Sequence, residues 1–320
     1  MKSYFLPLLF VLAIAMACSS KDKRYPYQLT EHKVHLLRVP KTILSIDQNY
    51  GARIISLKYY GKELLSPYTI NAENFGSTLW TSPQSDWGWP PIATFDVMPY
   101  DLNINGSELQ FYSAPDKKSG FQIRKHLKLG ARDSAFIITY SIKNVSDEEK
   151  SVAPWEVTRR RAGGISFFPG DADSAILSKS NLPGVTYQDG IVWFEYDPKK
   201  ILADTKLYAN ASEGWLANVQ DSILFLKSFT DIPTSQLPPD QGEVEIFADG
   251  TRSYIELENH GEYMPLFPGD SVVYKMKWLV KTIPAHIDKS VGSKDLVNWV
   301  RKVVFKNKFR IRDHLIIDED

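Results

Sequence analysis

Residues 51–65 have the sequence GARIISLKYYGKELL, in which the run Ala52–Tyr59 is rich in β-branched and aromatic residues and follows a turn at Asn49–Gly51. Such a run beside turn residues is typical of a β-strand. Many strands without alternating helices predict an all-β fold in which two large antiparallel sheets form a sandwich. The other runs of this kind are Lys41–Asp47, Phe121–Leu129, Ala135–Lys143, Ile191–Tyr196, Ser222–Thr230, Tyr254–Glu258 and Ser271–Val280.

Helical periodicity is clear only near the end of the chain. Ser293 is a suitable N-cap for a helix over Asp295–Val304, whose apolar residues recur on one side. We therefore expect a β domain over residues 31–284, followed by a short helix and a surface tail over residues 285–320.

Composition excludes several classes of protein. The chain has 320 residues, with 43% hydrophobic and 12% aromatic residues, so it can bury a large core. The 38 basic and 38 acidic side chains balance, which argues against a nucleic-acid partner. One cysteine rules out an intrachain disulfide, and no phosphate-cradling glycine motif is present. We expect no cofactor and no metal, although a calcium ion among clustered acids stays open.

The first residues have the features of an export signal. Lys2 precedes an uncharged apolar run at residues 5–17, which is short for a membrane span. Cys18 follows Ala15-Met16-Ala17 and resembles the acylated cysteine of a bacterial lipobox, although Ala15 and Met16 depart from the usual residues. We expect a signal peptide at residues 1–17, lipidation of Cys18 and a tether at 18–30. This implies membrane anchoring, on the periplasmic side of a Gram-negative outer membrane; an ordinary secretory signal is the alternative.

The densest group of candidate ligand-binding residues is Phe75–Pro91, which contains three tryptophans within ten residues. Pro83 and the pair Pro90-Pro91 exclude a regular strand over the whole stretch. Tryptophan faces suit the C–H face of a sugar ring, and carboxylate or amide groups bind its hydroxyls. Gln84, Asp86, Trp87 and Trp89 are therefore candidates for binding a sugar. The alternative is that the tryptophans close one end of the sandwich.

Two further strands carry charged residues at alternate positions. Glu156, Thr158 and Arg160 share one face of a strand, while Trp155, Val157 and Arg159 share the other. On a later strand, Glu256 and Glu258 share a face, where like charges need a cation, a proton or a ligand. Surface salt bridges and solvent exposure are the simpler alternatives for these groups.

Four segments follow one another along the chain, Gly51–Leu65, Phe75–Trp80, Tyr254–Glu258 and Leu266–Ser271. Together they resemble the aldose 1-epimerases of the galactose mutarotase-like superfamily. Gly51–Leu65 is similar to the opening hairpin of those enzymes, and Phe75–Trp80 to the segment after it. Tyr254–Glu258 and Leu266–Ser271 resemble their closing strands around an L-x-P-G-D turn. With the loop SPQSDWGWPP, Ser82–Pro91, the chain resembles a bacterial lipoprotein branch of this superfamily. The resemblance implies a β-supersandwich with a sugar site on a concave face.

The resemblance also implies roles for particular residues. In the epimerases a carboxylate takes the proton of the anomeric hydroxyl, and a histidine protonates the ring oxygen. Glu258 matches the position of the base best, with Glu256 second. The segment that carries the acid corresponds to Pro154–Val157, which has no histidine. Glu156 can replace this acid only if its surroundings raise its pKa.

We therefore expect an exported lipoprotein that binds a carbohydrate over Gln84, Asp86, Trp87, Trp89, Arg159, Arg160 and Glu256. If it is an aldose isomerase, Glu258 is the base and Glu156 the acid. The alternatives are a carbohydrate-binding module without turnover, and a glycoside hydrolase or polysaccharide lyase that uses the same carboxylates.

Overall fold

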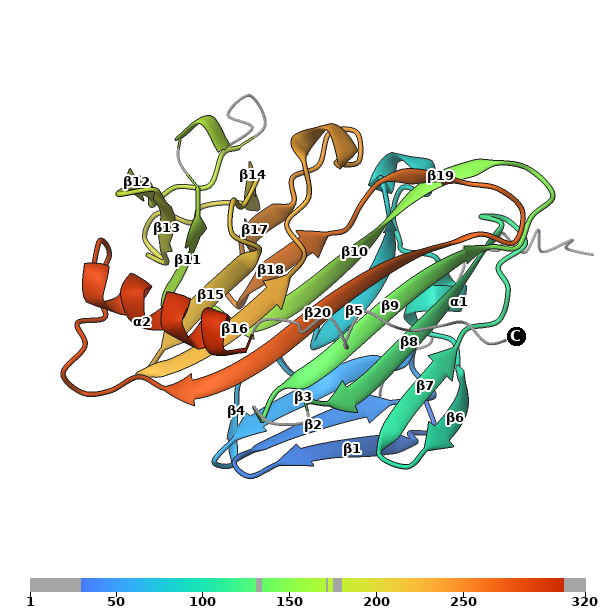
Figure 1. Ribbon diagram of the computed structural model, residues 1–320, viewed down its shortest axis with the longest axis horizontal. Helices are drawn as coiled ribbons and strands as arrows, with labels where there is room; N and C mark the ends of the chain where they lie inside the picture. The colour runs from blue at the N-terminus through green and yellow to red at the C-terminus, as the bar shows by residue number, and fades with distance from the viewer. Residues whose placement is uncertain (1–29, 131–133, 171, 175–179, 308–320) are drawn as a thin grey trace, which may run out of the picture.

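The computed structural model describes residues 30–130, 134–170, 172–174 and 180–307. Within these ranges the strands form two ten-stranded antiparallel sheets that pack on each other (Figure 1). The predicted all-β sandwich is therefore confirmed. Cys18, with the expected signal peptide and most of the tether, lies outside the described residues, as does most of the expected tail.

The first sheet has the order β1-β2-β3-β5-β10-β18-β17-β14, with β4 paired to β3 and β19 paired to β10. Strand β10 pairs with β5 along one edge and with β18 along the other, so it is a central strand of the sheet. The strands of this sheet are β1 (Val34–Val39), β2 (Thr42–Asp47), β3 (Arg53–Tyr59), β4 (Lys62–Glu63), β5 (Ser77–Ser82), β10 (Lys150–Arg161), β14 (Thr205–Ala209), β17 (Val244–Ala248), β18 (Tyr254–His260) and β19 (Met264–Leu266).

The second sheet has the order β12-β13-β11-β15-β16-β20-β9-β8-β7-β6. Its strands are β6 (Asp101–Asn105), β7 (Glu108–Tyr112), β8 (Phe121–Leu129), β9 (Phe136–Asn144), β11 (Ile165–Pro169), β12 (Val185–Gln188), β13 (Ile191–Glu195), β15 (Trp215–Gln220), β16 (Ile223–Phe229) and β20 (Ser271–Thr282). The helical segments are η2 (Gln84–Asp86), α1 (Ala93–Asp96), η3 (Ala172–Ser174), η4 (Thr234–Gln236) and α2 (Lys294–Lys306).

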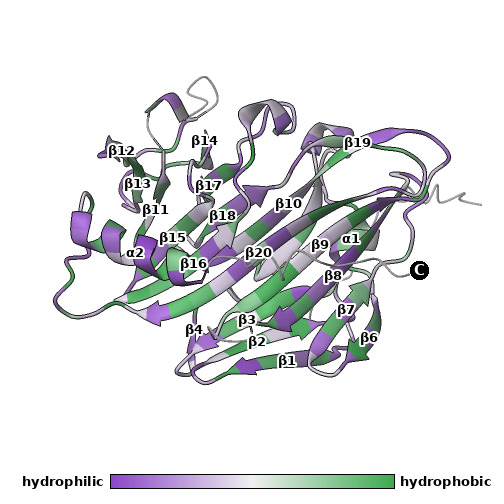
Figure 2. Ribbon diagram, in the orientation of Figure 1, coloured by the Kyte–Doolittle hydropathy of each residue, from purple (hydrophilic) through white to green (hydrophobic). Residues whose placement is uncertain are grey.

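The main core lies between the two sheets. Leu79 and Leu257 of the first sheet and Ile138 and Phe225 of the second belong to it, and all are buried. Side chains alternate between the two faces of each strand, which Figure 2 shows as hydrophilic and hydrophobic bands along β20. The face of the first sheet that points away from this core carries Glu258, and we name it the Glu258 face.

Helix α2 covers the outer face of the second sheet (Figure 1). Leu296 and Val300 belong to an apolar cluster with Trp193, Trp215 and Leu279. The Ser293 hydroxyl accepts a hydrogen bond from the Leu296 backbone nitrogen at 3.2 Å, so the expected N-cap is confirmed. Among the helices of the described ranges, none combines the length and apolar character of a membrane span.

Each of the eight predicted strand segments is a strand whose ends differ by at most two residues from the expectation. The expectation that Phe75–Pro91 is not a regular strand over its whole length is confirmed, since β5 covers only Ser77–Ser82. Proline limits strand pairing only from Pro83 onward, so Trp80 is a strand residue and the other two tryptophans follow in a loop.

Candidate functional site

Four tryptophans gather on the Glu258 face. Trp80 of β5 and Trp155 of β10 are register partners, and their ring centroids are 5.1 Å apart. The loop Pro83–Pro91, which we name the Trp87 loop, brings Trp87 within 5.9 Å and Trp89 within 6.0 Å of the Trp80 ring. The side chains of Trp80 and Trp155 are buried, whereas Trp89 is 53% exposed. The four rings therefore form a cluster that offers one accessible aromatic surface.

The orientation of Trp87 is fixed by a hydrogen bond. Its Nε1 donates to the backbone oxygen of Thr81 at 2.8 Å, across the turn that starts at Pro83. Its ring centroid lies 6.3 Å from that of Trp155. The Trp87 loop is thus attached to the centre of the first sheet through Trp155.

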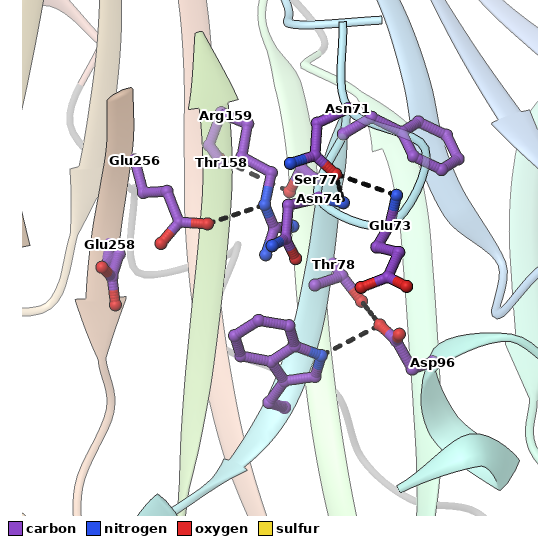
Figure 3. Close-up of polar contacts among 12 residues, drawn as sticks. Asn71, Glu73, Asn74, Ser77, Thr78, Asp96, Thr158, Arg159, Glu256 and Glu258 are labelled. Atoms are coloured by element: carbon purple, nitrogen blue, oxygen red, sulfur yellow. Dashed lines mark hydrogen bonds and ion pairs between the residues drawn. The ribbon is translucent and has the colours of Figure 1, made fainter. Parts of the chain in front are cut away.

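The two glutamates of β18, Glu256 and Glu258, lie on the Glu258 face beside the tryptophan cluster, and we name them the late glutamates. Arg159 is the register partner of Glu256, and its Nε donates to Glu256 Oε1 at 2.8 Å. Trp155 Nε1 donates to Glu258 Oε2 at 2.7 Å. Figure 3 shows Glu256 and Glu258 side by side on their strand, with Arg159 facing Glu256. The side chains from β10 and β18 therefore converge as the alternation of residues predicts.

A lysine that the sequence reasoning missed joins this group. Lys206 Nζ on β14 lies 2.8 Å from Glu258 Oε2 and 2.6 Å from Glu245 Oε2 on β17. Because β14, β17 and β18 are neighbours in the sheet, the three side chains share the Glu258 face. Period-2 alternation in Thr205–Ala209 and Val244–Ala248 was the available signal, but nothing local says that these strands pair with β18.

In this group, three buried atoms have neither a hydrogen bond nor an ion pair to another described residue. They are Nη1 and Nη2 of Arg159 and Oε1 of Glu258. Buried polar atoms are nearly always paired with protein groups or with ordered water. The group therefore offers two donor nitrogens and one acceptor oxygen to a further polar molecule.

Burial perturbs the pKa values of all three glutamates on this face. It raises the pKa of Glu256 to about 7, against the opposing effect of Arg159. Burial also raises the pKa of Glu258 and Glu245, although the Lys206 ammonium opposes it in both. For Lys206, burial lowers the pKa, but Glu245 and Glu258 outweigh this effect and the net shift is upward. Such shifts are concentrated at functional sites.

A histidine lies next to this group. His260 follows Glu258 by two residues on β18, and its ring stacks on Trp155 with centroids 5.2 Å apart. Burial lowers the pKa of His260 well below its usual value, with a further contribution from Lys206. His260 is therefore a neutral imidazole at pH 7. The sequence reasoning ended this strand at Glu258 and so missed it.

The expectation that Glu156 and Arg160 line the same face as Glu258 is wrong. Glu156 Oε2 forms an ion pair with Lys227 Nζ of β16, and Ser77 and Thr158 hydroxyls donate to its Oε1 at 2.5 Å each. Arg160 is buried over the Phe225 ring. Both side chains lie between the sheets because they alternate with Trp155 and Arg159 along β10. Glu156 therefore has no route to a ligand on the Glu258 face.

Gln84 and Asp86 lie on the Trp87 loop, and no hydrogen bond or ion pair within the described residues joins them to Glu256 or Glu258. The Gln84 side-chain amide donates to the Gly88 backbone oxygen at 3.4 Å within the loop. Asp86 is exposed and lines a hollow of about 450 Å³ that Trp87 also lines. Of the expected binding residues, Trp87, Trp89, Arg159, Glu256 and Glu258 gather around the tryptophan cluster.

The charged group on the Glu258 face already contains a cation. Lys206 bridges Glu245 and Glu258, which is where a metal ion would otherwise balance the two carboxylates. In the described part of the chain, no three His, Cys, Asp or Glu side chains are grouped as metal ligands.

The raised pKa of Glu256 predicts a pH dependence of stability. Because the folded pKa is about 7 and the ordinary value is 4.5, the folded state binds more protons between these pH values. This contribution to the free energy of unfolding is complete below pH 4.5 and falls as the pH rises to about 7, by at most roughly 1.4 kcal/mol per pH unit. Glu256→Gln should remove it. Urea unfolding at pH 5, 6, 7 and 8 measures the difference, and identical pH profiles for both proteins would contradict it.

A family model described as "Domain of unknown function (DUF4380)" matches residues 61–281, which include β5, β10, β14, β17 and β18. No curated protein matches the chain.

Solved structures with a similar fold come from several bacteria. A putative aldose 1-epimerase from Escherichia coli K12 is 12% identical, with a TM-score of 0.56, and the match covers 79% of this chain and all of that one. A galactose mutarotase-like protein from Lactobacillus casei is 10% identical with a TM-score of 0.55, covering 78% of this chain and 100% of the other. A putative mutarotase from Salmonella typhimurium is 13% identical with a TM-score of 0.52, covering 79% and 91%. The described fold is therefore galactose mutarotase-like, as the resemblance implied.

Proposed function

Because the chain belongs to the DUF4380 family and has the galactose mutarotase-like fold, we propose that it binds a carbohydrate on the Glu258 face. The sugar lies over Trp155, Glu256 and Glu258, with Trp87 and Trp89 beside it. The names of similar structures, a putative aldose 1-epimerase and a putative mutarotase, agree with a carbohydrate ligand.

One observation carries this proposal, namely the unpaired buried atoms of Arg159 and Glu258 next to the tryptophan cluster. A sugar hydroxyl is both a donor and an acceptor, so neighbouring hydroxyls can accept from Arg159 Nη1 and Nη2 and donate to Glu258 Oε1. The exposed ring of Trp89 offers an apolar surface to the C–H face of the same sugar. Apolar walls with a few convergent polar groups are what a small-ligand site requires.

A second candidate function is aldose isomerisation at the same site. It is favoured by the raised pKa of Glu256, about 7, which keeps a proton available beside Glu258 at neutral pH. Glu258 takes the proton of the anomeric hydroxyl while Glu256 gives its proton to the ring oxygen. The bond between the anomeric carbon and the ring oxygen breaks, and an open-chain aldehyde forms. Rotation about the first carbon–carbon bond and reversal of both proton transfers give the other anomer.

This assignment differs from the expectation in its acid. The acid is Glu256 and not Glu156, because Glu156 lies between the sheets in an ion pair with Lys227. Glu256 retains 11% of its side-chain surface exposed beside Arg159, so a ligand on this face can reach it.

Calorimetry and polarimetry separate the candidate functions. Binding of D-galactose or D-glucose by calorimetry, weakened roughly tenfold in Trp89→Ala, supports a carbohydrate site, since Trp89 is 53% exposed beside the tryptophan cluster. Trp193→Phe, which alters a buried ring under helix α2, is the control and should leave the affinity unchanged.

The rate of optical-rotation decay and the release of reducing ends distinguish an isomerase, a non-catalytic module and a hydrolase. Faster decay of the optical rotation of fresh α-D-glucose or α-D-galactose supports the isomerase. Binding without acceleration supports a non-catalytic module, and release of reducing ends from an oligosaccharide supports a hydrolase. Equal sugar binding by wild type and Trp89→Ala would show that the site lies elsewhere.

We also propose that the chain is exported and lipidated at Cys18, in agreement with the apolar run at residues 5–17 and the small residues before the cysteine. Several acyl chains would hold it at a membrane, on the periplasmic side of a Gram-negative outer membrane, because one chain alone binds only marginally. Labelled palmitate should enter the wild-type chain and be absent from Cys18→Ser. Equal labelling of both proteins would contradict this assignment.

A further inference from the structure

The hollow beside the Trp87 loop adjoins the tryptophan cluster of the Glu258 face, and Trp87 belongs to both. It measures about 450 Å³ and lies where the end of β5, the loop before β8 and the start of β10 meet. Trp87 and Tyr263 are among its walls, and both are half-buried. A hollow of this size is within the usual range for small-ligand sites.

Trp87 connects the hollow to the Glu258 face. Its ring lines the hollow and also lies near Trp155, whose Nε1 donates to Glu258. The hydrogen bond from Trp87 Nε1 to Thr81 keeps this ring in place between the two regions. A ligand longer than one sugar ring can therefore extend from the hollow past Trp87 toward the Glu258 face.

The hollow carries a surplus of positive charge. Lys118 and Lys150 line it, and the lysines that form ion pairs among the described residues are others, namely Lys62, Lys128, Lys206, Lys227 and Lys294. Asp86 is the single carboxylate among the lining residues of the described chain. Free ammonium groups favour a carboxylate or another anion over a neutral hydroxyl.

A buried hydroxyl in the same hollow is also unpaired. Ser82 is 1% exposed, and its Oγ has no hydrogen-bond partner among the described residues, although Ser82 lines the hollow. A hydroxyl that is buried without a partner indicates a site for water or for a polar ligand. This second observation is independent of the lysines.

We propose that this hollow is a subsite for a carboxylate-bearing sugar unit, a uronate, in an oligosaccharide whose neighbouring unit lies on the Glu258 face. The carboxylate lies near Lys118 and Lys150, a ring hydroxyl pairs with Ser82, and the sugar ring lies against Trp87 and Tyr263. This inference rests on the proposed carbohydrate-binding function and narrows its ligand to an acidic oligosaccharide.

Calorimetry with the full-length chain tests the inference. The probes are trigalacturonate and trimannuronate, each compared with its uncharged methyl ester. At least one acid should bind roughly tenfold more tightly than its ester, because two ammonium groups each contribute a modest ion pair. The double variant Lys118→Gln/Lys150→Gln should bring the acid to the affinity of its ester. Lys117→Gln removes a neighbouring exposed charge that does not line the hollow and should preserve the difference.

The outcomes distinguish failure of this inference from failure of the proposed function. Equal binding of acid and ester by the wild type, or a difference that persists in the double variant, overturns the uronate subsite while carbohydrate binding stands. If none of the four probes and neither D-galactose nor D-glucose binds, the proposed function fails and the subsite with it.

Discussion

Lys227→Met is expected to lower the free energy of unfolding by about 3–5 kcal/mol. Lys227 is fully buried between the sheets, where its Nζ pairs with Glu156 and donates to the backbone oxygen of Leu257 at 2.7 Å. Removal of the ammonium leaves the Glu156 carboxylate buried without its cation, and that uncompensated charge is costly. Urea unfolding at pH 7, followed by tryptophan fluorescence, measures the loss.

Two further variants make this expectation specific. Glu156→Gln combined with Lys227→Met removes both charges and should recover most of the lost stability, since a neutral pair costs less to bury. Lys62→Met breaks the exposed pair with Asp221, where the two side chains are 50% and 75% exposed, and should change stability by about 1 kcal/mol or less. A loss below about 1 kcal/mol for Lys227→Met would mean that Glu156 is solvated, which would restore it as a candidate ligand-binding residue.

The wrong prediction of the face on which Glu156 lies shows what strand alternation can establish. The period of two correctly separated Glu156, Thr158 and Arg160 from Trp155, Val157 and Arg159. It does not say which face points to the partner sheet, and charge normally indicates the solvent side. Here the side chains on both faces of β10 are buried. The cation that permits burial of Glu156 lies on β16 of the other sheet. No local pattern carries that pairing.

The late glutamates were easier to predict than their neighbours. Glu256 and Glu258 lie in one run that is unmistakably a strand, so their shared face follows from sequence alone. Lys206 and Glu245 lie on other strands, and their contact with Glu258 depends on the order β18-β17-β14. Strand order arises from long-range packing, which a single sequence does not encode in a readable local form.

The Trp87 loop was predicted as a binding segment from its composition. In the structure its side chains lie in two different regions. Trp87 and Trp89 join Trp80 and Trp155 on the Glu258 face, whereas Asp86 lines the neighbouring hollow. A loop without a repeating period gives no rule for the direction of each side chain. The residues were thus identifiable from sequence, but their division between two regions was not.

Glu258→Gln is expected to lower the rate of anomer interconversion by roughly 10²–10⁴, with a smaller loss of sugar affinity, if the protein is an isomerase. The substitution is nearly isosteric. The amide oxygen can still accept from Trp155 Nε1 and Lys206 Nζ, as Glu258 Oε2 does. The change falls on the unpaired Oε1, which becomes an NH₂ group that cannot take a proton from an anomeric hydroxyl.

Glu245→Gln is the matched control for this prediction. Glu245 is equally buried, pairs with the same Lys206 ammonium and lies opposite Glu258 in the register of β17 and β18. If Glu258 acts directly, its substitution should abolish the acceleration of optical-rotation decay while Glu245→Gln retains most of it. Equal losses in both variants would mean that the charge balance around Lys206, and not a proton acceptor at Glu258, supports the activity. A wild type that binds sugar without acceleration would assign the same unpaired oxygen to ligand binding alone, and Glu258→Gln would then weaken affinity without any kinetic effect.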